Sequence, residues 1–354
     1  MRALITKDAR NGERIRPYLG GEEVNTSPAQ SYHRFAIDFE DFPLRRSDEL
    51  VSWGEMTSKQ KEEALREGVV PIDYRGPVAA DWPDLLAIVA SRVKPSRDKL
   101  GNNPDAKRRK RFWWQYGRRT TGLENASQGH SVIIGRSMVS GQWSFARIPA
   151  QQINALTIVS FLYPSFSPFS VLQSRIHEIW GRSFSSSMKD DLRYAPSDCF
   201  ETFPFPLCYE TDPKLEVAGQ TYHDHRAELM IAANEGMTKT YNRFHKSEER
   251  GAAIERLRDL HDDMDRAVLR AYGWDDLAET LRPQFLTPET EDDHTYQNRY
   301  FWPADQRDLV LSRLLALNAE RHTEEVAAGI APASGTRRAT EEGEDEAQDS
   351  LDLD

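Results

Sequence analysis

The residues in this sequence most suited to chemistry form a run of cations beside aromatic rings. Between Arg92 and Arg119 there are eleven Lys or Arg and two Asp, a net charge of +9 in 28 residues. Cations of this kind can neutralise phosphates, while neighbouring rings stack on bases or wedge between them. The alternative is a solvated loop that leads into a core strand. Trp113 and Trp114, within the run, are expected to pack in a core rather than to serve as stacking platforms.

No recognisable catalytic signature accompanies these cations. The sequence has no G-x-G-x-x-G after a strand, no P-loop, no H-E-x-x-H and no G-x-S-x-G. Clusters of His with acidic residues at 177–178, 223–225 and 261–263 fall in expected helices, where adjacent side chains point in different directions. Cys199 has no basic partner nearby in the sequence and is expected to be a small buried residue. We therefore predict no catalytic, cofactor-binding or metal-binding residue on this chain.

The net charge of −11 by itself argues against a nucleic-acid partner, but its distribution does not. From Glu320 to Asp354 there are eleven acidic and three basic residues, a net of −8, so the remaining 319 residues carry only about −3. A charge block of this kind has nothing to bury and predicts a disordered acidic tail over residues 321–354. The body that remains is compatible with DNA.

The elements that must position the cations are of two kinds. Residues 1–206 alternate short strands with helices, including strands near 33–39, 131–135, 142–148 and 155–163 and helices near 58–67, 81–94 and 167–181. After Pro213 the apolar period becomes helical through residue 320. The fold class expected is α+β: a mixed α/β domain at 1–206, a small all-α domain at 207–320, and the tail. Without an apolar leader, a membrane span or a disulfide framework, we expect a soluble, cytoplasmic protein.

Three segments of the sequence are long enough to compare with known families: NGERIRPYLGGEEVN at 11–25, SRIHEIW at 174–180 and LRYAPSDCFETFPFP at 192–206. They resemble the MmeI-like type II restriction–modification proteins. The first is similar to the segment that opens the target-recognition region of that family, and the other two are similar to the end of that region. KTYNRFH at 239–245 and MDRAVLRAYGW at 264–274 are similar to the C-terminal helical part. The resemblance covers about residues 10–320 and implies a target recognition domain whose partner is double-stranded DNA.

The departure from the family is as informative as the match. Members combine a nuclease, an adenine-specific methyltransferase and DNA recognition in one chain, and use S-adenosylmethionine, with Mg²⁺ for cleavage. Their Gly-rich S-adenosylmethionine loop, Asn-Pro-Pro-Tyr type motif and nuclease motif are not found in this sequence. The resemblance therefore implies a catalytically inactive recognition portion: a truncated gene, a split subunit or a fragment, with a separate methyltransferase or nuclease chain as a possible partner and no membrane partner.

The resemblance also implies which side chains read DNA. Lys189, Asp191 and Arg193 align with the family's variable base-reading positions, and in an extended segment they face one side. Lys189 can donate to guanine and Asp191 can accept from cytosine, so together they could read one G·C pair, with Arg193 on a second guanine or a phosphate. The alternative is a surface turn with a weak Asp–Lys ion pair. Contacts with the DNA backbone are assigned to Lys107, Arg108, Arg109, Lys110, Arg118 and Arg119. Lys239 and Arg243, four apart on one face of an expected helix, are weaker candidates, and a solvated helix surface is the alternative for both.

Two other functions remain open at this stage. The chain could be a complete DNA-modifying enzyme with an unrecognised active site, in which case it should bind S-adenosylmethionine in calorimetry. It could instead be an interaction protein that uses its acidic tail and C-terminal helices to bind basic partners. Gel-shift measurements with and without the tail separate that function from DNA recognition.

Overall fold

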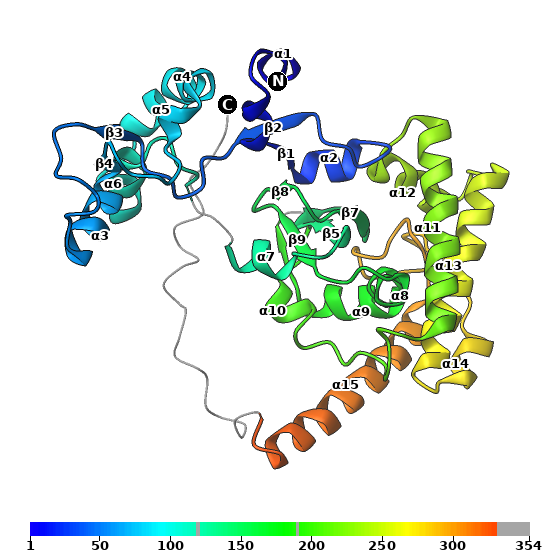
Figure 1. Ribbon diagram of the computed structural model, residues 1–354. Coiled ribbons are helices and arrows are strands. Elements are labelled where there is room, and N and C mark those ends of the chain that lie inside the picture. Colours follow the sequence, from blue (N-terminus) through cyan, green and yellow to red (C-terminus); the bar gives the residue numbers. More distant parts are fainter. Residues whose placement is uncertain (118–120, 189–190, 331–354) are drawn as a thin grey trace.

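The computed structural model describes residues 1–117, 121–188 and 191–330. Figure 1 shows a small helical lobe, built from α3 to α6, beside a larger body whose short sheets are flanked by the long helices α11 and α13. The predicted α+β class is confirmed: helices alternate with five small sheets of two or three strands among the described residues.

The N-terminal segment and the small lobe surround a core of their own, which includes Phe39, Trp82, Leu85 and Trp114. Trp114 is buried as predicted, and its indole N–H donates to the Phe42 carbonyl at 2.9 Å. The elements are α1 (Arg2–Lys7), a 3-10 turn (Ala9–Glu13), β1 (Ile15–Leu19), α2 (Gly21–Thr26), β2 (Arg34–Ile37), β3 (Arg45–Ser47), α3 (Ser58–Glu67), β4 (Val69–Pro71), a second 3-10 turn (Ala79–Asp81), α4 (Pro83–Arg92), α5 (Lys94–Asp98) and α6 (Pro104–Arg111).

Three small sheets form the centre of the larger body. One has the order β7-β5-β9, with both pairings antiparallel; in a second, β1 lies between β2 and β8. The third has the order β10-β11-β6 and is also antiparallel. The elements are α7 (Thr121–Ala126), β5 (Val132–Ser137), β6 (Val139–Ser140), β7 (Ala146–Pro149), β8 (Ile153–Asn154), β9 (Ile158–Phe161), β10 (Ser186–Met188) and β11 (Asp191–Arg193).

The single helix expected at 167–181 is instead two helices, α8 (Phe166–Gln173) and α9 (Arg175–Phe184). Ser174 separates them because its backbone is extended, with φ −66° and ψ 156°. Its hydroxyl accepts the backbone N–H of His177 and so caps α9. A serine that can cap a helix, located within the apolar helical pattern, is the feature of the sequence that could have indicated two helices here.

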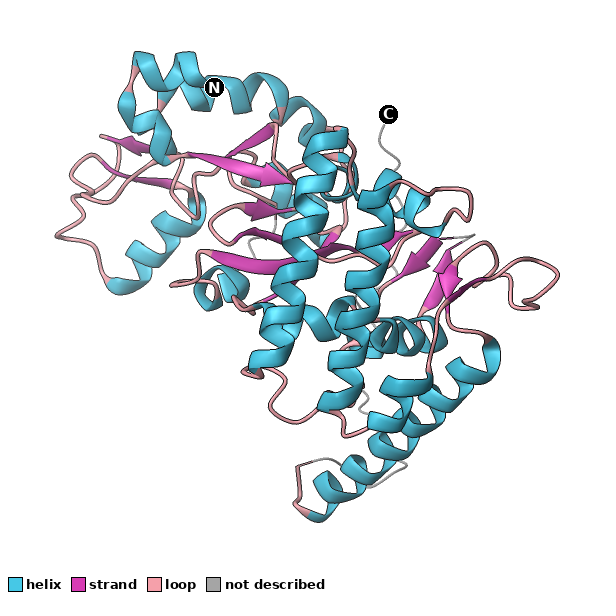
Figure 2. Ribbon diagram, turned by 90° about the vertical axis from the view of Figure 1, so that its right-hand side faces the viewer, coloured by secondary structure: helices cyan, strands magenta, loops and turns pink. Residues whose placement is uncertain are grey.

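The C-terminal part is helical as predicted, with one exception. A two-stranded antiparallel pair, β12 with β13, stands where an all-α domain was expected. Figure 2 shows long helices crossing in front of the strands. The elements are α10 (Pro196–Cys199), α11 (Pro213–Ala233), α12 (Met237–His245), α13 (Ala252–Ala271), α14 (Asp275–Thr280), β12 (Gln284–Phe285), β13 (Tyr300–Phe301) and α15 (Ala304–Ala327).

The boundary expected at 206/207 does not separate two hydrophobic cores. The largest core cluster joins Ile133 and Phe145 of the central region to Tyr222, Leu257 and Met264 of the C-terminal helices. A second cluster likewise joins α9 to α13, α14 and α15. The C-terminal helices therefore act as part of the support for the central sheets.

The last helix extends past residue 320, where the prediction placed the start of the tail. α15 continues to Ala327, and Arg321 on it donates to the Phe205 carbonyl at 2.5 Å. The acidic residues of this stretch within α15 are glutamates, which are good helix formers, so its charge did not end the helix. Residues 331–354 of the predicted tail lie outside the described residues. Within the described residues, none of the helices combines the length and apolar character that a membrane span needs.

Candidate nucleic-acid interface

Two of the three predicted base-reading residues, Asp191 and Arg193, lie on β11, which pairs with β10. The two strands pair in antiparallel register, with Ser186 opposite Arg193 and Met188 opposite Asp191. Leu192 and Tyr194 are buried and Arg193 between them is exposed, so this strand alternates between core and solvent as expected. Asp191 is the first residue of β11, while Lys189 lies outside the described residues.

A buried arginine, Arg136, packs against the end of this hairpin and was not identified from the sequence. Arg136 of β5 is fully buried, and its guanidinium lies 4.5 Å from the Trp143 ring centre and 4.8 Å from that of Tyr194. Tyr194 follows Arg193 directly and donates its backbone N–H to Met138 at 2.8 Å. Neither Nη atom of Arg136 has a hydrogen-bond partner among the described residues. Burial lowers the pKa of Arg136 to about 10, so it still carries its charge at neutral pH.

The Trp143 ring on the other side of Arg136 is fixed against α9. A Cβ added to Gly181 would lie 2.1 Å from Trp143, so only glycine permits this close approach. The Trp143 indole N–H donates to the Leu172 carbonyl at 2.9 Å. The hairpin therefore packs on a support that combines β5, which is distant in sequence, with α8 and α9, which directly precede the hairpin.

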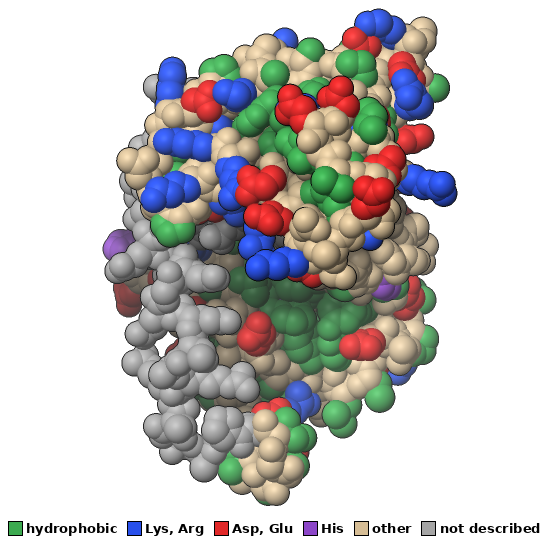
Figure 3. Space-filling view, turned by 60° about the vertical axis from the view of Figure 1, so that its left-hand side comes forward, with side chains coloured by type: hydrophobic (Ala, Val, Ile, Leu, Met, Phe, Trp, Pro, Cys, Tyr) green, Lys and Arg blue, Asp and Glu red, His purple; other side chains and the backbone are tan. Residues whose placement is uncertain are grey.

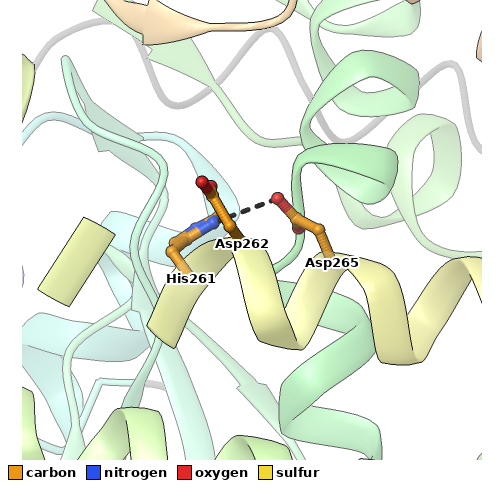
Figure 4. A group of neighbouring side chains, drawn as sticks. All are labelled: His261, Asp262 and Asp265. Atoms are coloured by element: carbon orange, nitrogen blue, oxygen red, sulfur yellow. Dashed lines mark hydrogen bonds and ion pairs between the residues drawn. The ribbon is translucent and has the colours of Figure 1, made fainter. Parts of the chain in front are cut away.

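The helix that follows Ser174 is anchored to α13 by a buried ion-pair network. The guanidinium of Arg175 contacts Asp262 and Asp265 at 2.6 Å each, and the Arg175 backbone N–H donates to Asp265 at 2.9 Å. His261 contacts the same Asp265 carboxylate at 3.2 Å, as Figure 4 shows. The pairing holds the start of α9 against α13.

This network corrects the sequence-based argument that adjacent side chains on a helix, such as His261 and Asp262, point in different directions and so cannot converge. Ligand atoms of His261, Asp262 and Asp265 lie within 4.8 Å of one another, although the first two are adjacent on a helix. The cation that these carboxylates hold is the guanidinium of Arg175. The cluster is thus explained as an Arg-centred network that stabilises the fold.

Two other side chains considered in the sequence analysis, His177 and Cys199, are buried in the core. Both ring nitrogens of His177 lie near carbonyl oxygens, at 3.0 Å from Leu172 and 3.1 Å from Cys199. Burial lowers the pKa of His177 to about 4 and outweighs those carbonyls, which favour the charged ring. Cys199 is buried as predicted, and burial raises the pKa of its thiol to about 11.

The five consecutive cations from Lys107 to Arg111 lie on a helix, α6, rather than on a loop. Of its cations, Arg108 donates to the Gly117 carbonyl at 2.7 Å and Arg109 pairs with Asp105 at 2.7 Å. Lys107 is exposed and Lys110 half-buried, and neither has an ion pair within the described part of the chain. Figure 3 shows Lys and Arg side chains interspersed with acidic ones on this side of the molecule. Arg118 and Arg119 lie outside the described residues.

Lys239 and Arg243, the two predicted contacts with the DNA backbone on α12, differ in their surroundings. Lys239 is exposed, whereas Arg243 pairs with Glu235 and Glu249 at 3.0 Å each. Both carboxylates raise the pKa of Arg243, and they already offset its charge. Of the two, Lys239 is the one whose charge is available to a phosphate.

Comparisons with known proteins cover the part of the chain that holds the hairpin. The family model for the MmeI target recognition domain matches residues 89–207, the part of the chain from α4 to the segment after α10. Over these residues the match confirms the resemblance to the family's target recognition domain that was drawn from the sequence. No curated protein matches the chain.

The fold is also similar to that of a solved structure of the Type IIL restriction-modification enzyme MmeI in complex with DNA. The TM-score is 0.50 at 14% sequence identity, over 91% of this chain and 33% of that chain. At this identity the likeness shows a shared fold. This chain spans about a third of the length of that enzyme.

Proposed function

Because the chain contains a domain of the MmeI target-recognition family, we propose that it recognises a specific DNA sequence for a restriction–modification system. The observation that carries the proposal is the family match over residues 89–207, which ends just beyond the hairpin that holds the candidate readers. A short strand with a buried face and an exposed arginine is a suitable element for contacting base edges.

Within this function, Lys189 and Asp191 jointly read one G·C pair. An ammonium donates to O6 and N7 of guanine, and a carboxylate accepts from N4 of cytosine. Arg193 lies two positions beyond Asp191 on β11, which suits a second guanine or a phosphate. Arg136 packs against Tyr194, the residue that directly follows Arg193, and so supports the end of β11.

The test is a double charge swap, Lys189→Asp with Asp191→Lys, followed by selection of bound sequences from a random duplex library. The preferred base pair at one position should change, because each lost bidentate contact costs about 1–3 kcal/mol of discrimination. A matched control is Lys59→Asp with Glu63→Lys on α3, two exposed residues whose swap also leaves the net charge unchanged. If the swapped hairpin selects the same sequence as the original, the assignment is wrong.

Methyl transfer and cleavage belong, in this proposal, to a separate portion or chain of the system. S-adenosylmethionine, and Mg²⁺ for cleavage, would bind there, and this chain acts in the cytoplasm as the part that selects the site for adenine-N6 methylation. The absence of the family's catalytic motifs from this sequence supports that division. Calorimetry with S-adenosylmethionine should accordingly show no binding to this chain.

A further inference from the structure

A polar pocket of about 400 Å³ lies between the end of α12 and the connection from β12 to β13. Its walls come from three parts of the chain that are far apart in sequence. They are Gln142, then Asn242, His245, Lys246, Ser247 and Glu248, and then Phe285, Leu286, Thr287, Gln297, Asn298 and Arg299. Two of the walls belong to the C-terminal part, and the third follows β6 directly.

The pocket lies next to the candidate reading hairpin. β6 pairs with β11 in antiparallel register, with Val139 opposite Arg193 and Ser140 opposite Leu192. The chain therefore continues from Ser140 to Gln142 in the direction of the β10–β11 turn. The Gln142 amide N–H donates to the Asn242 side-chain oxygen at 2.8 Å, which ties the end of β6 to the pocket wall.

Arg299 supplies spare donors at this wall. A guanidinium has five N–H groups. Arg299 uses three of them, on the carbonyls of Thr295 at 2.9 Å and Gly141 at 2.8 Å and on Gln142 Oε1 at 3.4 Å. None of these acceptors is charged, and Arg299 forms no ion pair among the described residues. Burial, and then the charge of Arg182, lower the pKa of Arg299 to about 10 although Glu178 acts in the opposite direction, so the guanidinium still carries its charge at neutral pH.

Two neighbouring side chains add to the donors. His245 Nδ1 accepts the Tyr300 backbone N–H at 3.2 Å, which leaves the ring proton on Nε2. Burial, followed by the charges of Arg299 and Arg175, lowers the pKa of His245, so the ring is neutral at neutral pH. Lys246 is exposed and has no ion pair within the described ranges. Glu248 is the one acidic side chain in the wall.

We propose that this pocket holds a phosphate of the DNA backbone beside the base pairs that the hairpin reads. The pocket is lined by two cations, Lys246 and Arg299, and by one carboxylate, Glu248. The guanidinium of Arg299 is oriented by hydrogen bonds to uncharged oxygens. Such a lining suits an anion whose charge is spread over several oxygens. The inference rests on the proposed function and adds to it a contact from the C-terminal part, outside the residues that the family model matches. The C-terminal part thus positions the DNA as well as supporting the sheets.

The experiment measures DNA affinity as a function of salt for Lys246→Gln and Glu248→Gln on a random-sequence duplex. Lys246→Gln should weaken binding and lower the log–log salt slope by about 0.9, the value for one phosphate contact. Glu248→Gln should tighten binding, since it removes the charge that repels the phosphate. Both positions are exposed, so both variants should fold, and equal melting temperatures check this. Lys59→Gln on α3 is the matched control and should leave the slope unchanged.

The outcomes separate this inference from the proposed function. If the unaltered chain binds DNA but both pocket variants have its affinity and slope, the pocket inference is overturned and DNA recognition stands. If the unaltered chain binds no duplex, the proposed function fails and this inference with it. Titration with inorganic phosphate is the third arm: phosphate binding that Lys246→Gln removes, together with an unchanged DNA slope, would make the pocket a small-anion site and also overturn the inference.

Discussion

At the scale of single residues, Arg136 and Arg175 show two ways to bury an arginine. Arg136 lies among aromatic rings and forms no ion pair with any described residue, whereas Arg175 is 1% exposed and held by two aspartates. Burial by itself would raise the pKa of Asp265, but the charges of His261 and Arg175 lower it below its usual value. Breaking one member of such a network leaves a buried charge without its partner.

Asp265→Asn should therefore destabilise the protein by about 3–5 kcal/mol in urea unfolding at neutral pH. The sign of the pH dependence follows from the lowered pKa. The contribution of Asp265 is complete above the unfolded pKa of about 3.9 and is lost as the pH falls through the folded value. Asp263→Asn, on the same helix but 62% exposed, is the control and should cost little. Equal losses in the two variants would count against the network.

At the scale of elements, some cations of α6 are bonded to other parts of the protein and others have no ion-pair partner among the described residues. Arg108 and Arg109 are used within the fold, but Lys107 and Lys110 are one helical turn apart and unpaired among the described residues. Residues three apart lie on neighbouring positions of the helix surface. The two lysines are thus the cations of α6 best placed to contact a DNA backbone.

The double substitution Lys107→Gln with Lys110→Gln should lower the log–log salt slope of DNA binding by about two, without altering the preferred sequence. Arg109→Gln should lower it less, because Asp105 already offsets that charge. The comparison uses the same duplex and the same salt series for all variants. Weaker binding with an unchanged slope would show that the lysines act through folding rather than through phosphates.

At the scale of the whole molecule, the distribution of charge and the packing of the hydrophobic cores suggest different boundaries along the chain. The two largest core clusters cross the 206/207 boundary, so the central sheets and the C-terminal helices share cores. The charge instead changes near the C-terminus: residues 331–354 hold eight acidic and two basic residues, a net of −6. A like-charged segment of this kind repels the DNA that the rest of the chain is proposed to bind.

Removal of residues 331–354 should therefore tighten DNA binding several-fold at low salt, and the difference should shrink as salt screens the repulsion. Gel-shift titrations at two ionic strengths measure this. Unchanged or weaker binding after removal would favour the alternative in which the tail itself binds a basic partner.

The sequence by itself determined the features that depend on neighbouring residues. The apolar period from Ile254 to Val268 predicted α13, and the alternation of an extended segment placed Arg193 on the proposed reading face, where its side chain is exposed. The family resemblance came from sequence too. Local patterns suffice for these because backbone geometry fixes which side chains share a face.

Only the tertiary structure decided which distant residues meet. The chain path brings Arg136 to Tyr194, Arg175 to Asp262 and Asp265, and Arg299 to Gly141. No local period encodes such contacts, because they depend on how whole elements pack. The same reason explains why the argument from adjacent residues failed for His261 and Asp262, whose side chains converge, and why the basic run could not be divided into used and available cations from sequence.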